Sequence, residues 1–183
     1  MAGSQMESSE LSSEGCHVAL TAEPLNVQRT MDRVRSPEAG AIVLFAGEPP
    51  PTPMTISAQS SAHSHRPGTT RDSFAGQPVK ELAYTAYTQL ALRTMLAIGS
   101  DVRARHGLKG IAMAHRLGTV PIGEESILIA VSAPHRQAAW RAGEEALEAC
   151  KARVEVWKRE EFHGGHGVWR ANRDGVAGEK VDS

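Results

Sequence analysis

Over much of the chain, hydrophobic and polar residues are arranged in short runs that are typical of β-strands. Residues 41–47, AIVLFAG, are almost continuously apolar and predict a buried β-strand. Residues 17–22 and 78–87 predict two further strands, the second by its alternation of apolar and polar side chains. Residues 110–118 and 126–133 also predict strands, and we expect these two to pair because only a turn-rich segment separates them.

In other segments the apolar residues recur every three to four positions, which is the period of an α-helix. A short helix is predicted at residues 26–35, ending before Pro37. A longer helix is predicted up to about residue 105, with one apolar face made of Leu92, Met95, Leu96 and Val102. A third helix, at 136–151, has an apolar stripe made of Ala139, Ala142, Ala146 and Cys150. Strands and helices alternate without a regular βαβ repeat, so the predicted fold class is α+β.

The chain of 183 residues suits one domain, which we place at residues 16–174. Residues 1–15 are rich in Ser and Glu and predict a disordered polar tail, and residues 175–183 predict a flexible one. Residues 48–68 contain five of the ten prolines together with many Ser and Thr, which predicts a loop or disorder. Such a long structureless loop is unusual inside a compact domain.

Charge and cysteine content narrow the functional classes. The formal net charge of −1 argues against general nucleic-acid binding. No apolar run is long enough to cross a membrane, and the first fifteen residues resemble neither a secretory nor a mitochondrial signal. Cys16 and Cys150 lie far apart, which suits two ordinary thiols in a reducing compartment. We therefore expect a cytoplasmic protein.

Basic residues near the third predicted helix form the main candidate site. His135 and Arg136 lie at its N-terminus, where free backbone N–H groups favour an anion, and Lys151 lies at its other end. Lys158 lies at the end of the strand-like run that follows. Strand alternation puts Lys158 on one face with Val154 and Val156, and it puts Glu155, Trp157 and Arg159 on the other face.

The basic residues at both ends of the helix, together with Lys158 and Arg71, suggest one pocket for an anionic substrate. The same residues also have structural explanations, because Lys151 suits a helix C-terminus and charges protect an edge strand.

Other chemical motifs give little signal. The chain has no Walker-type loop, no GxGxxG and no nucleophile elbow. His163 and His166 lie in a Gly-rich loop without a Cys or carboxylate at convincing spacing, so we expect no metal and no cofactor.

Several quoted segments together resemble the large, catalytic subunit of molybdopterin synthase. They are AGAIVLFAG, TTRDSF, LAYTAYTQLALRTM, the long block from His115 to Glu160, and GVWRANRD. The resemblance runs from about His17 to Asp174. It implies an α/β-hammerhead-type domain with an additional small antiparallel sheet. It also implies a sulfurtransferase of molybdenum cofactor biosynthesis, which converts cyclic pyranopterin monophosphate into the dithiolene of molybdopterin.

The resemblance further implies partners and site residues. The sulfur donor would be the C-terminal glycine thiocarboxylate of a small ubiquitin-like carrier, and two large and two small subunits would form a heterotetramer. Catalysis would fall to Lys151, beside the carrier's terminal glycine, and to Lys158. The substrate-binding positions implied by the family are Arg71, His135, Arg136, Lys151, Lys158, Arg159, Glu160 and Arg173, the last reaching across the dimer.

The insertion at residues 48–68 departs from the family pattern, in which LFAG runs almost directly into TTRDSF. A retained intron in a conceptual translation is one origin, since the codons of Gly47 and Glu48 can contain a splice-donor pattern. A tolerated surface insertion is the other, since lengthening a loop costs little entropy. Two other functions stay open: a carrier-binding module of the same fold with impaired catalysis, and a protein that binds a phosphate ligand or nucleotide.

Overall fold

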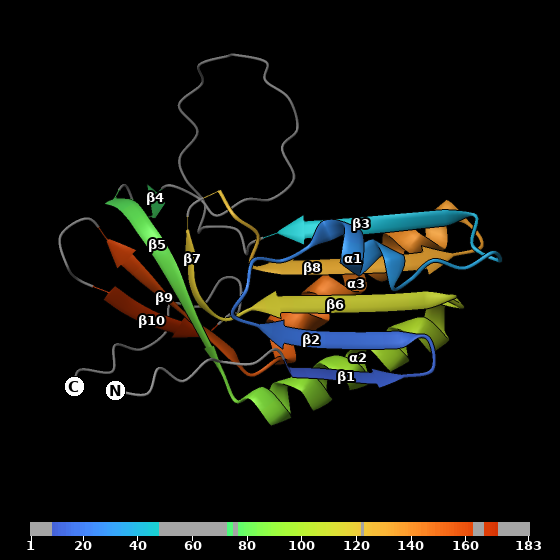
Figure 1. The fold of residues 1–183 in the computed structure, drawn as a ribbon, viewed down its shortest axis with the longest axis horizontal. Helices are drawn as coiled ribbons and strands as arrows, with labels where there is room; N and C mark the ends of the chain where they lie inside the picture. Colours follow the sequence, from blue (N-terminus) through green and yellow to red (C-terminus); the bar gives the residue numbers. More distant parts are fainter. Residues whose placement is uncertain (1–8, 48–72, 75–76, 122, 163–166, 172–183) are drawn as a thin grey trace, which may run out of the picture.

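The computed structural model describes residues 9–47, 73–74, 77–121, 123–162 and 167–171, and these form two β-sheets and three helices (Figure 1). The first sheet has five strands in the order β1-β2-β6-β8-β3. The bounds are β1 Ser9–Ser13, β2 Cys16–Thr21, β6 Gly110–Arg116, β8 Ile127–Ala133 and β3 Ala41–Gly47. Only β2 and β6 run parallel; the other neighbours are antiparallel.

The second sheet is antiparallel and lies beyond one end of the first (Figure 1). Its strand order is β10-β9-β5-β4, and β7 also pairs with β5. The bounds are β10 Gly167–Ala171, β9 Val156–Phe162, β5 Gln77–Ala86, β4 Ser73–Phe74 and β7 Gly118–Pro121. A mixed first sheet plus a small antiparallel sheet confirms the predicted α+β class.

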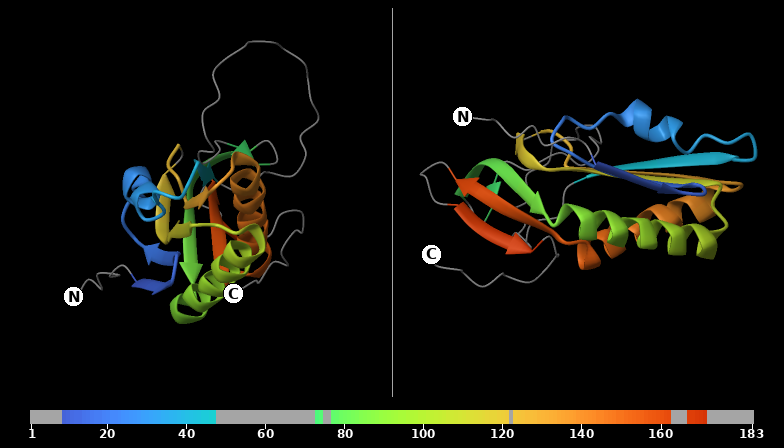
Figure 2. Two further views of the ribbon diagram at one scale, coloured as in Figure 1. Left: turned by 90° about the vertical axis from the view of Figure 1, so that its right-hand side faces the viewer. Right: turned by 60° about the horizontal axis from the view of Figure 1, so that its bottom comes forward.

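Two long helices, α2 (Thr88–His106) and α3 (Arg136–Arg153), cover one face of the first sheet (Figure 2). The short α1 (Val27–Asp32) packs on the opposite face. The predicted apolar stripe of α3 is confirmed: all four of its residues, Ala139, Ala142, Ala146 and Cys150, are buried. Of the predicted α2 face, Leu92, Met95 and Val102 are buried, and Leu96 packs against them while partly exposed.

Small residues bring the helices close to the sheet. A Cβ on Gly99 of α2 would lie 2.5 Å from the Sγ atom of Cys16, so only glycine fits this contact with β2. Gly143 of α3 faces the sheet at a looser distance, since its Cβ would lie 3.8 Å from Val43. The close approach of α2 to β2 therefore depends on Gly99, whereas Gly143 of α3 leaves room for a Cβ atom.

Three strand predictions need correction. Residues 9–13 form β1, so the prediction of a disordered tail over residues 1–15 is wrong there; Gly15, with a positive φ of 66°, makes the turn into β2. The polar edge position explains the error, because Leu11 alone on β1 packs against the core. Part of the predicted turn after β6 is β7, and part of the predicted C-terminal loop is β10.

The remaining domain predictions fall outside the described residues. The insertion at 48–68 lies there, as do residues 1–8 and the predicted tail at 175–183. Within the described segments, no helix combines the length and the apolar character that a membrane span requires.

Candidate active site

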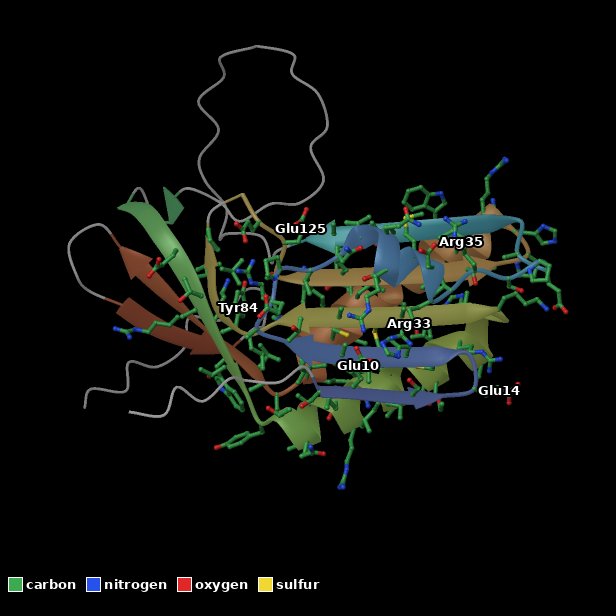
Figure 3. The ribbon with its side chains drawn as sticks, viewed as in Figure 1. Glu10, Glu14, Arg33, Arg35, Tyr84 and Glu125 are labelled. Carbon is green, nitrogen blue, oxygen red and sulfur yellow. The ribbon has the colours of Figure 1, made fainter. Side chains whose placement is uncertain are left out.

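The candidate site lies at the junction of the two sheets. Three connections pass through it: β5 leads into α2, β6 leads into β7, and α3 leads into β9. Figure 3 labels Tyr84, which lies where β5 crosses the end of the first sheet. Residues far apart in the sequence therefore meet here.

Lys151 reaches the junction from the last turn of α3. Its side chain is only 10% exposed, and its Nζ atom lies 3.5 Å from Oε1 of Glu148, one turn earlier. The Glu148 side chain is 62% exposed, so this ion pair lies at the surface edge of an otherwise buried lysine. A buried ammonium requires compensating acceptors, which makes this position more demanding than an ordinary helix C-terminus.

Lys158 reaches the same junction from β9. It pairs directly with Tyr84 of β5, and directly opposed residues in an antiparallel pair share a face. Tyr84 is 1% exposed and belongs to the main core together with Val156. The predicted alternation along this strand is therefore confirmed for Val156 and Lys158, whose face is turned toward the first sheet.

His115, at the end of β6, is buried beside Tyr84, the cross-strand partner of Lys158. Its ring stacks edge-on against Tyr84, with centroids 5.0 Å apart. Its Nδ1 atom lies 2.8 Å from the carbonyl oxygen of Arg116. Because a carbonyl only accepts, Nδ1 carries the proton and Nε2 is the acceptor nitrogen. Burial lowers the pKa of His115 from its ordinary 6.5 to about 4, so the imidazole is neutral near pH 7.

A small cavity connects His115 with Lys151. Its volume is about 10 Å³, at the lower limit of the space that can hold one water molecule. Its polar lining comes from β6, α3 and the loop before β8; the lining residues are Met95, His115, Ser126, Ile127, Leu147, Cys150, Lys151 and Val154. Ser126 also donates to the carbonyl oxygen of Gly47 at 3.2 Å, so the end of β3 adjoins this cavity.

His135 and Arg136 lie at the opposite end of α3. Lys151 lies fifteen positions after Arg136, and at a rise of 1.5 Å per residue the two Cα atoms are about 22 Å apart. His135 and Arg136 therefore cannot share a pocket with Lys151 of the same chain. Both His135 and Arg136 are exposed, and His135 makes no side-chain cap to the helix.

The other predicted site residues divide into two groups. Arg159 lies on the face of β9 opposite to Lys158, beside Trp157, whose indole stacks edge-on with Tyr87 at 5.1 Å. Glu160 lies in β9 across from Leu82, and its side chain is outside the described part of the chain. Arg71 and Arg173 are outside it as well.

Neither cysteine of the chain is suited to carry sulfur. Cys16 and Cys150 are both free and buried. Burial raises the pKa of the Cys16 thiol, and it raises the pKa of Cys150 to about 12. Because the thiolate is the nucleophile, both groups are unreactive near neutral pH.

A second hollow, of about 160 Å³, lies under α1 on the other face of the first sheet. Its rim carries Arg29 and Arg33, and both donate to the carboxylate of Glu10, at 2.9 and 3.3 Å. Figure 3 labels Glu10 and Arg33 on this face. These arginines already share a carboxylate, so the hollow gives no support to a phosphate or nucleotide site.

Metal ligation receives no support in the described segments, where no group of three or more His, Cys, Asp or Glu side chains is placed to hold an ion. The predicted loop histidines, His163 and His166, lie outside them.

Sequence reasoning missed the residues that link the two lysines. No sequence motif points to His115 or Tyr84, nor to Glu124, which forms an ion pair with the nearly buried Arg116. A signal for His115 was present, because it shares the parity of Ile111 and Met113 along β6. That parity places the imidazole on the core face of the strand.

Sequence comparison finds close relatives for nearly the whole chain. A family model described as MoaE protein matches residues 54–153. A protein named molybdopterin synthase catalytic subunit from Pyricularia oryzae is 62% identical over 177 residues, covering 97% of this chain and 86% of that protein. One of the same name from Neurospora crassa is 63% identical over 174 residues, covering 94% of this chain and 74% of that protein.

Solved structures show the same fold. Molybdopterin synthase from Staphylococcus aureus superposes with a TM-score of 0.68 at 28% identity, over 82% of this chain and 94% of that chain. A complex of subunits 1 and 2 of molybdopterin-converting factor from Helicobacter pylori gives a TM-score of 0.58 at 18% identity, over 80% of this chain and 85% of that chain. From the matching family model and these fungal identities, we conclude that the chain belongs to the MoaE protein family.

Proposed function

We propose that this chain is the catalytic subunit of a molybdopterin synthase, a sulfurtransferase of molybdenum cofactor biosynthesis. The observation that carries the proposal is the position of Lys151, nearly buried in the last turn of α3, the helix that leads into the strand carrying Lys158. The fungal relatives bear this name over nearly the full chain. The reaction inserts two sulfurs into cyclic pyranopterin monophosphate and gives the dithiolene of molybdopterin.

The sulfur comes from a partner in this proposal. Both thiols of the chain are buried and have raised pKa values, so a persulfide on this chain is disfavoured. A small ubiquitin-like carrier with a C-terminal glycine thiocarboxylate supplies sulfur without a chain cysteine. The Helicobacter pylori neighbour is itself a complex of two different subunits, which supports a small-subunit partner. The enzyme would work in the cytoplasm.

Lys151 neutralises and orients the incoming thiocarboxylate, and Lys158 stabilises charge as the cyclic phosphate opens. Arg71, His135, Arg136 and Arg173 hold the phosphate and the pterin, while Arg159 and Glu160 contact the substrate. Because His135 and Arg136 lie about 22 Å from Lys151 of the same chain, we assign these two to the site of a second copy.

The edge of β3 offers a way to bring two copies together. Among the residues that the structure describes, β3 is the last strand of the first sheet, and its apolar residues Ile42, Val43, Leu44 and Phe45 are only partly buried, which is unusual for an edge strand. Gly40, just before β3, bonds to Ala133, close to the N-terminus of α3, whereas Gly47 adjoins the cavity of Lys151.

Antiparallel pairing of two β3 edges about a two-fold axis would set the start of one strand against the end of the other. That pairing places His135 and Arg136 of one copy near Lys151 of its partner. The heterotetramer then contains two large subunits joined through β3, each with one small subunit.

Turnover tests the proposed function directly. The chain is mixed with thiocarboxylated small subunit and cyclic pyranopterin monophosphate, and the dithiolene product is measured. Lys151→Ala should abolish product, whereas Arg153→Ala, which removes an exposed charge from the same helix turn, should not. Normal turnover by Lys151→Ala would contradict the assignment.

A chain that binds the small subunit but makes no product would be the impaired binding module instead. Deleting residues 48–68 separates these cases: activity restored by the deletion assigns the loss to the insertion.

Mixing two inactive variants tests the shared site. Lys151→Ala and Arg136→Ala subunits, combined in equal amounts, give mixed dimers with one complete site, so about a quarter of wild-type activity should return. Each variant alone should be inactive. If both residues act within one chain, the mixture stays inactive.

A further inference from the structure

His115 has a fixed hydrogen-bonding role that the residues around it determine. Its Nδ1–H group donates to the Arg116 carbonyl oxygen at 2.8 Å, and Tyr84 holds the ring edge-on at 5.0 Å. The side chain is buried, with 3% of its residue exposed. The imidazole therefore presents Nε2, and only as an acceptor.

The same imidazole shares a cavity with Lys151. The cavity volume of about 10 Å³ leaves room for one water molecule at most. Lys151 enters this space from α3, and His115 enters it from β6. On the solvent side, the Glu148 carboxylate approaches Lys151 Nζ to 3.5 Å. The lysine thus lies between an exposed carboxylate and a buried imidazole.

We propose that His115 is a positioning residue for Lys151, whose Nζ donates through one water in the shared cavity to Nε2 of His115. This role rests on the proposed function, in which Lys151 meets the carrier's thiocarboxylate. By holding the ammonium from the buried side, His115 sets where the positive charge lies when the carrier's C-terminus arrives. The imidazole itself does not touch the substrate.

The surroundings suit a permanent acceptor. Burial lowers the pKa of His115 to about 4, so Nε2 stays unprotonated at the pH where the enzyme works. The other titratable groups around the pair are Cys150 and Tyr84, with Glu148 at the rim and Lys158 across from Tyr84. The pKa of Cys150 is raised to about 12, so its thiol is neutral and does not compete as an anion for the ammonium.

Two substitutions of His115 distinguish a role in positioning Lys151 from a role in packing alone. His115→Gln keeps an amide near the place of Nε2, and His115→Leu removes every polar atom. Binding of the small subunit, with an ordinary C-terminal carboxylate, should weaken roughly 10- to 100-fold in the leucine variant, the usual loss of a hydrogen bond to a charged group. The glutamine variant should recover most of that affinity. Equal loss in both variants would overturn the proposal.

A double-mutant cycle then tests whether His115 acts through Lys151. In a Lys151→Ala background, His115→Leu should cause no further loss of affinity for the small subunit. If the double variant instead loses affinity by the product of the two single-variant factors, His115 acts independently of Lys151, and the proposal is overturned. Dithiolene formation by the wild-type enzyme is the control: a wild type that makes no product refutes the proposed function, whereas an active wild type with multiplied losses refutes only the role of His115.

A spectroscopic measurement needs no His115 variant. In full-length protein labelled with ¹⁵N-histidine, Lys151→Ala should move the Nε2 resonance of His115 and leave its Nδ1 resonance in place. His17, on β2 away from the cavity, provides the control resonance, which should not move. An unchanged His115 Nε2 resonance would refute the contact.

Discussion

Lowering the pH should destabilise the folded protein through His115, and the size of the effect follows from its burial. The folded protein keeps this imidazole neutral down to a pKa of about 4, whereas the ordinary pKa is 6.5. Above pH 7 both the folded and the unfolded states are neutral at this residue, so it adds no pH dependence. Below pH 6.5 the unfolded chain binds a proton at this residue that the folded state does not bind. The free energy of unfolding therefore falls as the pH falls.

The magnitude follows from the proton balance. Each pH unit inside this window costs about 1.36 kcal/mol of unfolding free energy for one proton. Between about pH 8 and about pH 5 the loss from His115 alone is therefore about 2 kcal/mol. His17, whose pKa is lowered chiefly by burial, acts in the same direction. Its contribution must be separated from that of His115.

Urea denaturation of the wild type and of His115→Gln, at about pH 8 and about pH 5, makes this separation, since His17 is present in both. At pH 8, the difference in unfolding free energy between the wild type and His115→Gln measures the packing cost of the substitution. This difference should shrink by about 2 kcal/mol at pH 5, because glutamine does not titrate. A difference that stays constant between the two pH values would refute the buried, neutral state of His115.

Two further results are expected. Gly99→Ala should lower the free energy of unfolding by about 1–3 kcal/mol, because its Cβ would lie 2.5 Å from Cys16 Sγ, whereas Gly143→Ala, whose Cβ would lie 3.8 Å from Val43 Cγ1, should raise it by up to about 1 kcal/mol. Equal effects in urea denaturation would contradict this packing. Both Cys16 and Cys150 should resist iodoacetamide in the folded protein near pH 8 and react in denaturant, because burial raises their pKa values. Labelling of the folded protein at the denatured rate would show that the thiols are accessible.

The elements with strong periodicity were predictable from sequence. The stripe of Ala139, Ala142 and Ala146 fixes which face of α3 is buried, because helical spacing is a local property. The face of β9 that carries Val156 and Lys158 follows from strand alternation in the same way.

Features that depend on distant segments were not predictable. The strand β1 is polar and gains its order from pairing with β2 and from the Glu10 interactions with Arg29 and Arg33. The His115–Tyr84 contact needs the crossing of two sheets, which no local pattern contains. By contrast, the distance from Arg136 to Lys151 follows from the length of the predicted helix alone. This distance rules out a pocket that joins the two residues within one chain.

Charge, rather than sulfur chemistry, is what this chain would contribute to the proposed reaction. Its thiols are buried and their pKa values are raised, so the proposed reaction takes its sulfur from the carrier. The carrier's thiocarboxylate and the cyclic phosphate are both anions, and two like charges about 4 Å apart repel by about 4 kcal/mol at an effective dielectric constant near 20. In the proposed site, Lys151 of α3 and Lys158 of β9 would offset that repulsion. Because the Lys151 side chain is only 10% exposed, its charge would be in place before the anions arrive, and little reorganisation would be needed during transfer.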